Sequence, residues 1–258
     1  MANVLVTGAA GFIGSHTCEH LVAAGYRVVG LDNFRTGRRE NLRSLAGHPL
    51  FRLATVDVTD GSAFETAVAE AKPEAIIHLA ALVSVPESLQ DPVANFRLNL
   101  VATFHLAEAA RRHHVPRLVF ASSAAVYGNA TEVPLREDTP LHPLSPYGGA
   151  KLASESLLFS HARSFGFTVR CQRYFNVFGP RQDPRSPYSG VISIFAEKMS
   201  RGVAPPIFGD GEQSRDFIFV QDVARANVLA ATQPGQENGV ANICTGHATS
   251  LNRVAGGN

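Results

Sequence analysis

The expected architecture follows from residues 7–14, which read Thr7-Gly8-Ala9-Ala10-Gly11-Phe12-Ile13-Gly14. A strand is predicted before this stretch, over Asn3–Thr7, and a helix after it, over Phe12–Ala24. Glycine permits a tight turn and lets the backbone approach a pyrophosphate, which the helix N-terminus attracts. The same pattern also occurs in tight turns without a ligand, so the context carries the interpretation. We expect a dinucleotide to be surrounded by Gly8, Gly11, Phe12, Ile13 and Gly14.

Asp32 strengthens this interpretation, because it ends the next predicted strand, 18 residues beyond Gly14. A carboxylate there accepts hydrogen bonds from a ribose 2′-hydroxyl and repels a 2′-phosphate, which favours NAD over NADP. Asn33 is expected to contact the same cofactor. Three arginines follow closely and could instead hold a 2′-phosphate, so NADP stays open at this point: Arg35, Arg38 and Arg39.

The rest of the chain alternates short β-rich runs with helical patterns, which is typical of βαβ units around a parallel sheet. Further strands are predicted at Arg27–Leu31, Phe51–Val56, Ala75–Leu79, Arg117–Ser122 and Thr168–Tyr174. Further helices are predicted at Ser62–Ala71, Val93–His113 and Pro146–Ser164. The predicted fold class is therefore α/β, a Rossmann-type doubly wound parallel sheet.

After residue 175 glycine and proline become frequent and the regular alternation stops. We predict an NAD-binding Rossmann domain over residues 1–175 and a smaller C-terminal lobe over 176–258 that binds substrate at the carboxyl edge of the sheet. A late strand at Val240–Cys244 is expected to return to the sheet, and Ser250–Val254 begins to resemble a helix.

Composition excludes several functional classes. The 258 residues carry a formal net charge of +1, with 23 Lys+Arg against 22 Asp+Glu, so there is no basic field for nucleic acid or a membrane surface. The three cysteines have neither a disulfide nor a metal-ligand spacing, and no metal site is expected. The N-terminus enters a strand at once, without the charged start of a signal peptide. We expect a cytoplasmic enzyme.

Asp57 and Val58 follow the third predicted strand and would meet the adenine of the cofactor. The alternative is that Asp57 only caps the next helix, as acidic residues at strand ends often do. Spacing alone does not separate the two interpretations.

Tyr147 and Lys151 are the candidate catalytic pair. Ser145-Pro146 has the composition of a helix start, so residues 147 and 151 should lie on one helix face. A free tyrosine has a pKa of about 10, and a neighbouring ammonium and a nicotinamide ring would both lower it toward neutrality. Ser123 ends a strand at the same edge and could share the substrate's proton with Tyr147. Each residue alone would more often be structural.

These residues resemble the extended short-chain dehydrogenase/reductase family, in its NAD-dependent epimerase/dehydratase branch. Residues 7–14 are similar to the family's TGxxGxxG motif and residues 147–151 to its YxxxK motif. Residues 120–128, FASSAAVYG, resemble the serine motif of nucleotide-sugar 4-epimerases. Residues 173–181 and 215–217 resemble two further family segments, so the likeness extends along essentially the whole chain.

The resemblance implies further roles. Cofactor contacts are implied for Leu79, Ala80, Ala81 and Tyr174, and also for Tyr147 and Lys151. Contacts with a UDP-sugar are implied for Ser84, Val85, Ser123, Asn176, Val191, Arg215 and Phe217, with Arg215 on a phosphate. A homodimer through the helices 93–113 and 146–164 is also implied. Family members continue beyond residue 258, so we expect this chain to be truncated at its C-terminus.

The reaction is narrowed by Ala124 and Ala125. Dehydratases and decarboxylases of this branch carry acidic residues there, and alanine cannot exchange protons. The resemblance therefore implies NAD-dependent 4-epimerisation of a UDP-sugar through a 4-keto intermediate. Residues 84–85, 181–184 and 188–192 favour UDP-N-acetylhexosamines, with UDP-glucose/UDP-galactose close behind. The alternatives are a net oxidoreductase, a dehydratase of the same family, or a truncated, non-catalytic NAD-binding protein.

Overall fold

A seven-stranded parallel sheet forms the centre of the computed structural model, which describes residues 2–130, 133–183, 190–207, 209–235 and 237–256. The strands are β1 (Asn3–Thr7), β2 (Arg27–Asp32), β3 (Phe51–Thr55), β4 (Ala75–His78), β5 (Arg117–Ser123), β6 (Thr168–Tyr174) and β10 (Gly239–Ile243). Their spatial order is β10-β6-β5-β4-β1-β2-β3, so the chain winds outward in both directions from β1 and β4. The expected Rossmann-type sheet is confirmed.

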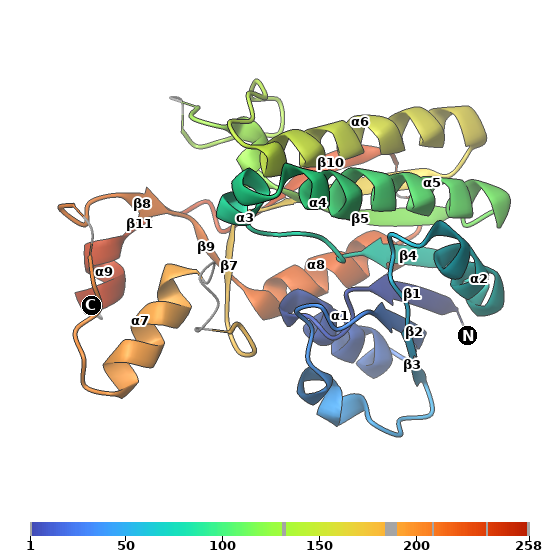
Figure 1. The fold of residues 1–258 in the computed structure, drawn as a ribbon, viewed down its shortest axis with the longest axis horizontal. Coiled ribbons are helices and arrows are strands. Elements are labelled where there is room, and N and C mark those ends of the chain that lie inside the picture. The colour runs from blue at the N-terminus through green and yellow to red at the C-terminus, as the bar shows by residue number, and fades with distance from the viewer. Residues whose placement is uncertain (1, 131–132, 184–189, 208, 236, 257–258) are drawn as a thin grey trace.

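Helices cover both faces of the sheet (Figure 1). On one face lie α2 (Gly61–Ala71), α5 (Ala102–Arg112) and α6 (Pro146–Phe165), and on the other lie α1 (Phe12–Ala23) and α8 (Val220–Thr232). Alternate residues of one strand enter two different cores: Leu5 packs in the α2/α5/α6 core, whereas Val4 and Val6 pack in the α1/α8 core. A strand covered on both faces is therefore apolar at consecutive positions, which is why Val4, Leu5 and Val6 of β1 show no alternation in the sequence.

The C-terminal residues build a smaller unit beyond the carboxyl ends of the strands, at the left of Figure 1. It contains two short sheets: β7 (Asn176–Phe178) pairs with β9 (Phe217–Phe219), and β8 (Ser214–Arg215) pairs with β11 (Thr249–Ser250). Two helices accompany them, α7 (Val191–Ser200) and α9 (Leu251–Gly256). In the described part of the chain, no helix combines the length and apolarity that crossing a membrane requires.

The expected helices and strands form, with some differences. The strand expected at 240–244 runs from Gly239 to Ile243 and pairs with β6. The single helix expected over 93–113 was wrong in its detail: α4 (Pro92–Asn95) passes through a π-helical segment (Phe96–Val101) into α5. Shorter elements had no periodic signal in the sequence and were not predicted, namely the 3-10 segments 39–45 and 124–127 and α3 (Val85–Gln90). The helix α8 was also not predicted; its Ala230 and Ala231 pack in the core that lies between the sheet and α1.

Candidate active site

The glycine turn between β1 and α1 is closed so tightly that side chains have no room in it. Gly8 has a φ of +68°, and a Cβ there would lie 2.9 Å from the Ala80 nitrogen. A Cβ on Gly14 would lie 2.0 Å from the Gly8 carbonyl oxygen. Among the described residues no side chain caps the N-terminus of α1 at Gly11, so its first amides remain available to an anion. This geometry fits a dinucleotide pyrophosphate.

Thr7 and His78 fix the opposite wall of this turn. The Thr7 hydroxyl lies 2.9 Å from His78 Nδ1 and accepts hydrogen bonds from the Leu79 and Ala80 amides at 3.1 Å each. Because those amides occupy the hydroxyl oxygen, Thr7 donates its own proton to Nδ1. Burial, together with the nearby positive charge of Lys151, lowers the pKa of His78 to about 3, so its imidazole is neutral. The loop containing Leu79, Ala80 and Ala81 is thereby held against the glycine turn.

Asp32 ends β2 with a carboxylate that is 7% exposed. Its oxygens accept hydrogen bonds from the Ala10 amide at 2.9 Å and the Phe34 amide at 2.7 Å. A Cβ on Gly37 would lie 2.8 Å from both oxygens, so the loop beyond Asp32 can close over it only with glycine at that position. Each oxygen retains a lone pair for a ribose hydroxyl.

The three arginines after Asp32 are each engaged by the protein. Arg35 pairs with Glu87, and Arg38 pairs with Asp183. The guanidinium of Arg39 stacks over the Phe34 ring, 4.3 Å from its centroid. A 2′-phosphate would have to compete with these partners and with the Asp32 charge, so the geometry favours NAD over NADP.

Asp57 follows β3 and holds its own turn. Its oxygens accept hydrogen bonds from the Thr59 amide at 2.8 Å and from the Asn33 side chain at 3.0 Å. The Val58 carbonyl oxygen lies 3.1 Å from His105 Nδ1 and accepts a hydrogen bond in the tautomer that carries its proton on that nitrogen. Asp60, not Asp57, caps α2 through the Ser62 and Ala63 amides, so the capping alternative for Asp57 was wrong. Adenine contacts of Asp57 and Val58 stay a prediction.

Tyr147, Lys151 and Ser123 come together at the carboxyl edge of the sheet. Ser145 caps α6 through the Gly148 amide at 3.1 Å with Pro146 after it, as the sequence predicted, and the Tyr147 amide donates to Ser88 Oγ. The Ser123 hydroxyl lies close enough to the Tyr147 hydroxyl to lower the pKa of the tyrosine. The Lys151 ammonium donates to the Ala121 carbonyl at 2.8 Å and lies 5.9 Å from the Tyr147 ring centroid.

The electrostatics of this trio differ from the expected lowering of the Tyr147 pKa. Burial raises the pKa of Tyr147, and the nearby Ser123 hydroxyl offsets only part of that rise. Burial also lowers the pKa of Lys151 to about 7, against the attraction of Glu155, which raises it. In the chain by itself Tyr147 is therefore a phenol, and an acidic phenol requires more positive charge than Lys151 alone supplies.

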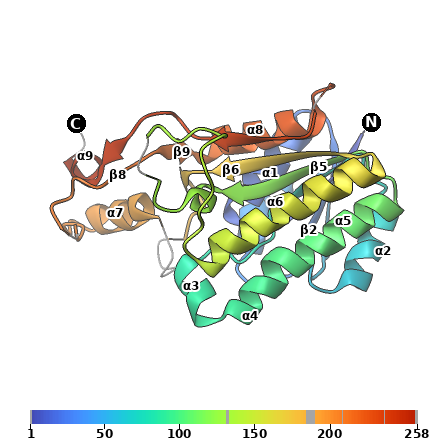
Figure 2. The same cartoon turned by 90° about the horizontal axis from the view of Figure 1, so that it is seen from above.

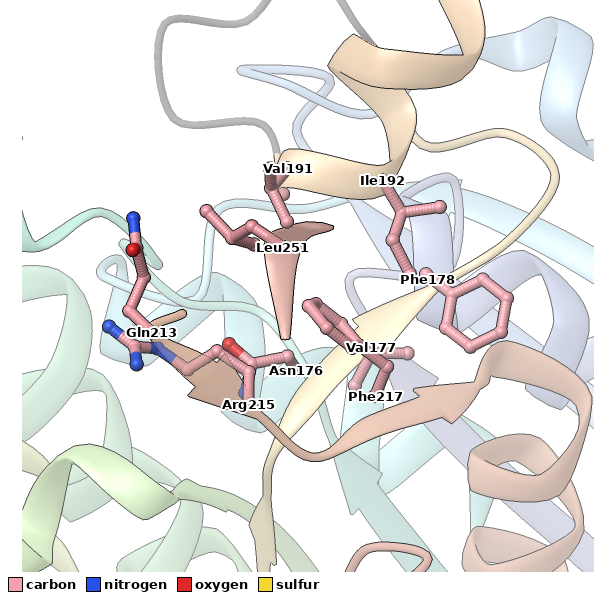
Figure 3. A pocket seen from close by; sticks show the side chains of 10 residues that line it. Asn176, Val177, Phe178, Val191, Ile192, Gln213, Arg215, Phe217 and Leu251 are labelled. Carbon is pink, nitrogen blue, oxygen red and sulfur yellow. The ribbon is translucent and has the colours of Figure 1, made fainter. Parts of the chain in front are cut away.

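A cavity of about 230 Å³ lies in the C-terminal unit (Figure 3). It brings together four of the residues expected to bind substrate, namely Asn176, Val191, Arg215 and Phe217. Arg215 is exposed and donates to the Ser214 carbonyl at 2.7 Å. The Asn176 side chain donates to the Asp216 carbonyl at 3.0 Å, which links β7 to β9. The cavity also contains Ile192, which ends the run 188–192 used to rank substrates, and two residues that the sequence did not single out as site residues, Gln213 and Leu251.

Other expected site residues have structural partners of their own. Ser84 is buried and caps α3 through the Glu87 amide at 3.0 Å, whereas Val85 is 38% exposed. The buried Tyr174 hydroxyl donates to Asn227 Oδ1, and its ring packs with Ala121. Their ligand contacts stay predictions. Three residues of the runs used to rank substrates, Pro184, Tyr188 and Ser189, lie outside the described residues.

Two buried asparagines, Asn95 and Asn99, support the site without having been predicted. The Asn99 side chain bonds both the amide and the carbonyl of Leu82, at 3.2 and 3.0 Å, and also donates to Asn95. Asn95 in turn donates to the Pro146 carbonyl at the start of α6. The signal available in the sequence was two asparagines four residues apart within a largely apolar helical pattern.

Known proteins are similar to this chain in sequence and in fold. Residues 4–244 match the family described as NAD dependent epimerase/dehydratase. A UDP-glucose 4-epimerase of Mycolicibacterium smegmatis is 42% identical over 251 residues, which are 97% of this chain and 79% of that protein.

Two solved structures are similar over nearly the whole chain. The UDP-N-acetylglucosamine 4-epimerase of Methanobrevibacter ruminantium, in complex with UDP-N-acetylmuramic acid, superposes with a TM-score of 0.93 at 39% identity, covering 99% of this chain and 80% of that one. The Thermus thermophilus UDP-glucose 4-epimerase complex with NAD gives a TM-score of 0.88 at 40% identity, covering 98% and 81%. The chain belongs to the NAD-dependent epimerase/dehydratase family.

Proposed function

We propose that this protein is an NAD-dependent epimerase acting at C4 of a UDP-sugar. The observation that carries the proposal is the Tyr147–Ser123 hydroxyl pair with Lys151 beside it, at the same sheet edge as an uncapped glycine turn. Relatives with the same fold are named as UDP-sugar 4-epimerases, one solved with a UDP-sugar and one with NAD.

The residues present fit NAD. The amides at the start of α1 suit its pyrophosphate, the missing side chains of Gly8 and Gly14 leave it room, and the Asp32 carboxylate suits a ribose diol. When bound, NAD supplies a nicotinamide that accepts a hydride from the sugar and returns it. Because the hydride returns, the reaction needs no external oxidant.

The chain's own groups handle the proton. Tyr147 accepts the proton of the sugar 4-hydroxyl at its phenolic oxygen, and the nearby Ser123 hydroxyl relays or shares it. Lys151 supplies the positive charge that favours the phenolate. The sugar passes through a 4-keto form and receives the proton back after turning over. Ala124 and Ala125 offer no acid or base for eliminating water, so the dehydratase alternative is disfavoured.

The cavity of about 230 Å³ lined by Asn176, Val191 and Arg215 suits the UDP part of the substrate. Arg215 is exposed at its edge and can meet two phosphate oxygens at once. Of the candidate sugars, we place UDP-N-acetylhexosamines first and UDP-glucose/UDP-galactose second.

The test is to incubate the purified protein with a panel of UDP-sugars, without added NAD, and to separate the products. We expect 4-epimers from the wild type and about 10²- to 10⁴-fold less from Tyr147→Phe, which still holds NAD. Released NADH in proportion to substrate would instead indicate a net oxidoreductase. NAD bound firmly with no sugar converted would indicate a non-catalytic protein.

We further propose that two copies pair through the outer face of the helices α4–α5 and α6. This face carries half-exposed aromatic residues, with Phe96 53% and Phe104 46% exposed. Between them lies an apolar groove that includes Leu100 and, from α6, Leu157. Figure 2 shows α5 and α6 side by side along this face. The cytoplasmic location also remains a proposal, supported by three cysteines that are all unpaired.

A further inference from the structure

Glu155 is a buried carboxylate one helical turn beyond Lys151, and Tyr147, Lys151 and Glu155 share one face of α6. It forms a two-pronged ion pair with Arg173 of β6: Arg173 Nε donates to Glu155 Oε1 at 3.0 Å and Nη2 to Oε2 at 2.8 Å. Both side chains are 4% exposed. The Ser122 hydroxyl donates to the same carboxylate, so the residue next to Ser123 is tied to the pair.

Arg173 extends these contacts toward the C-terminal strand. Its Nη1 donates to the Tyr127 hydroxyl at 2.9 Å and to the Glu137 carbonyl at 3.1 Å. The Tyr127 hydroxyl donates in turn to Asn242 of β10 at 2.6 Å. The ion pair therefore joins α6, the end of β5, β6 and β10, and both elements that carry Ser123, Tyr147 and Lys151 are among them.

Stability alone gives little reason for such a pair. Two charges lose their hydration on burial, and replacing a buried ion pair with apolar residues of similar size is often neutral or stabilising. The pair lies, however, beside a buried ammonium. Around Lys151 stand neutral His78 from β4, Cys171 from β6, and Tyr147 and Glu155 from its own helix, while Arg173 of β6 is bonded to Glu155. Burial raises the pKa of Cys171, which keeps its thiol protonated, so Glu155 is the anion that this group of residues provides.

We propose that Glu155 and Arg173 are positioning residues for the catalytic pair: Arg173 holds the Glu155 carboxylate in place, and Glu155 supplies the negative charge that keeps Lys151 in its ammonium form beside Tyr147. Without that anion the lysine would lose its proton at a lower pH and could no longer favour the phenolate. This inference rests on the proposed function only for its kinetic consequence. The charge state of Lys151 is measurable without any substrate.

The chain suits that measurement, because it contains only three lysines, Lys72, Lys151 and Lys198. Lysine labelled with ¹³C at Cε gives one NMR signal for each, and Lys151→Met identifies the signal of interest. In the wild-type protein with its bound cofactor we follow that signal against pH. In Glu155→Gln we expect the titration midpoint of Lys151 to fall by about one pH unit, which is about tenfold less ammonium above the midpoint. Glu155→Asp should restore much of the difference.

Leu158→Ala is the matched control, because Leu158 is buried on the same helix and carries no charge. It should lower the melting temperature and leave the Lys151 midpoint in place. If Glu155→Gln does not fold, the double variant Glu155→Gln/Arg173→Met removes both charges together; the midpoint should again fall, but by less, because the Arg173 cation that opposes Glu155 is lost as well. An unchanged midpoint in whichever of these variants folds would overturn the proposal.

Kinetics provide the second measurement. For Glu155→Gln we expect kcat to fall about tenfold with KM and bound NAD unchanged, and the alkaline limb of kcat to begin at lower pH. A loss of activity without a shift of that limb would make the pair structural only. If the wild type converts no UDP-sugar, the proposed function fails, whereas the NMR result still decides the role of Glu155.

Discussion

Lys151 places an ammonium where water cannot reach it, 3% exposed and against the Phe120 ring. Its pKa is about 7 in the folded chain and about 10.5 when unfolded, so between these values the unfolded state binds more protons. The free energy of unfolding therefore rises with pH across that window. Below pH 7 both states are protonated and the penalty for burying the charge is complete.

From this we predict that Lys151→Met stabilises the fold while abolishing activity. At pH 6 the gain should be on the order of 2–4 kcal/mol, less than the whole shift because the bond to the Ala121 carbonyl is lost as well. The advantage should shrink as pH rises toward 10.5. Urea unfolding at several pH values measures this, and a constant difference between the two proteins across that range would contradict it.

At this scale the sequence revealed residues that lie close along the chain or belong to a motif. Tyr147 and Lys151 are four positions apart, and their helix could be placed from Ser145 and Pro146 alone. Glu155 and Arg173 were not predicted, because 18 residues separate them and only the register of β6 beside α6 brings them together. The rise that burial causes in the Tyr147 pKa of the chain without cofactor was not predicted, since burial depends on tertiary packing that spacing does not reveal.

The first turn of α6 depends on two glycines with different roles. A Cβ on Gly148 would lie 2.7 Å from the Ala125 carbonyl oxygen and 3.1 Å from Pro143 Cβ. A Cβ on Gly149 would meet nothing within 4 Å. Gly148 therefore allows the catalytic helix to approach the turn after β5 closely, whereas Gly149 only makes the helix more flexible.

We predict opposite effects for the two alanine substitutions. Gly149→Ala should stabilise the protein by up to about 1 kcal/mol, because alanine favours the helix and no atom obstructs it. Gly148→Ala should destabilise it by about 1–3 kcal/mol and lower kcat, because α6 must move away from Ser123. Urea unfolding midpoints and initial rates measure both, and a loss of similar size in the two variants would show that the close approach is unimportant.

Elements with a clear period were predictable, and the short ones were not. The apolar runs and their turn residues located the first six strands to within one residue at either end. The π-helical segment 96–101 has no period of its own; its place is fixed by the bonds of Asn99 to Leu82, which is 17 residues away. The strands of the C-terminal unit, β7, β8, β9 and β11, are two or three residues long, which is too short for alternation to identify them.

At the scale of the whole molecule, the proposed dimer depends on the outer face of α5 and α6. Phe104 is 46% exposed there, and a carboxylate in its place would remain hydrated in a single copy. In a pair of copies the same carboxylate would be buried without a partner, which is costly. A charge at this position should therefore weaken an interface between two copies strongly, while it changes the stability of a single copy little.

We predict that the wild type sediments as a dimer and that Phe104→Glu weakens the dimer at least about 100-fold, enough to make it a monomer at micromolar concentration. Val203→Glu is the control, because it places the same charge on another half-exposed apolar residue, 50% exposed, in the C-terminal unit; this variant should stay dimeric. Tyr147 and Lys151 face the opposite side of α6, toward the sheet, so the monomer should retain its NAD. Sedimentation velocity separates the outcomes: a Phe104→Glu protein that remains dimeric would move the interface to another face.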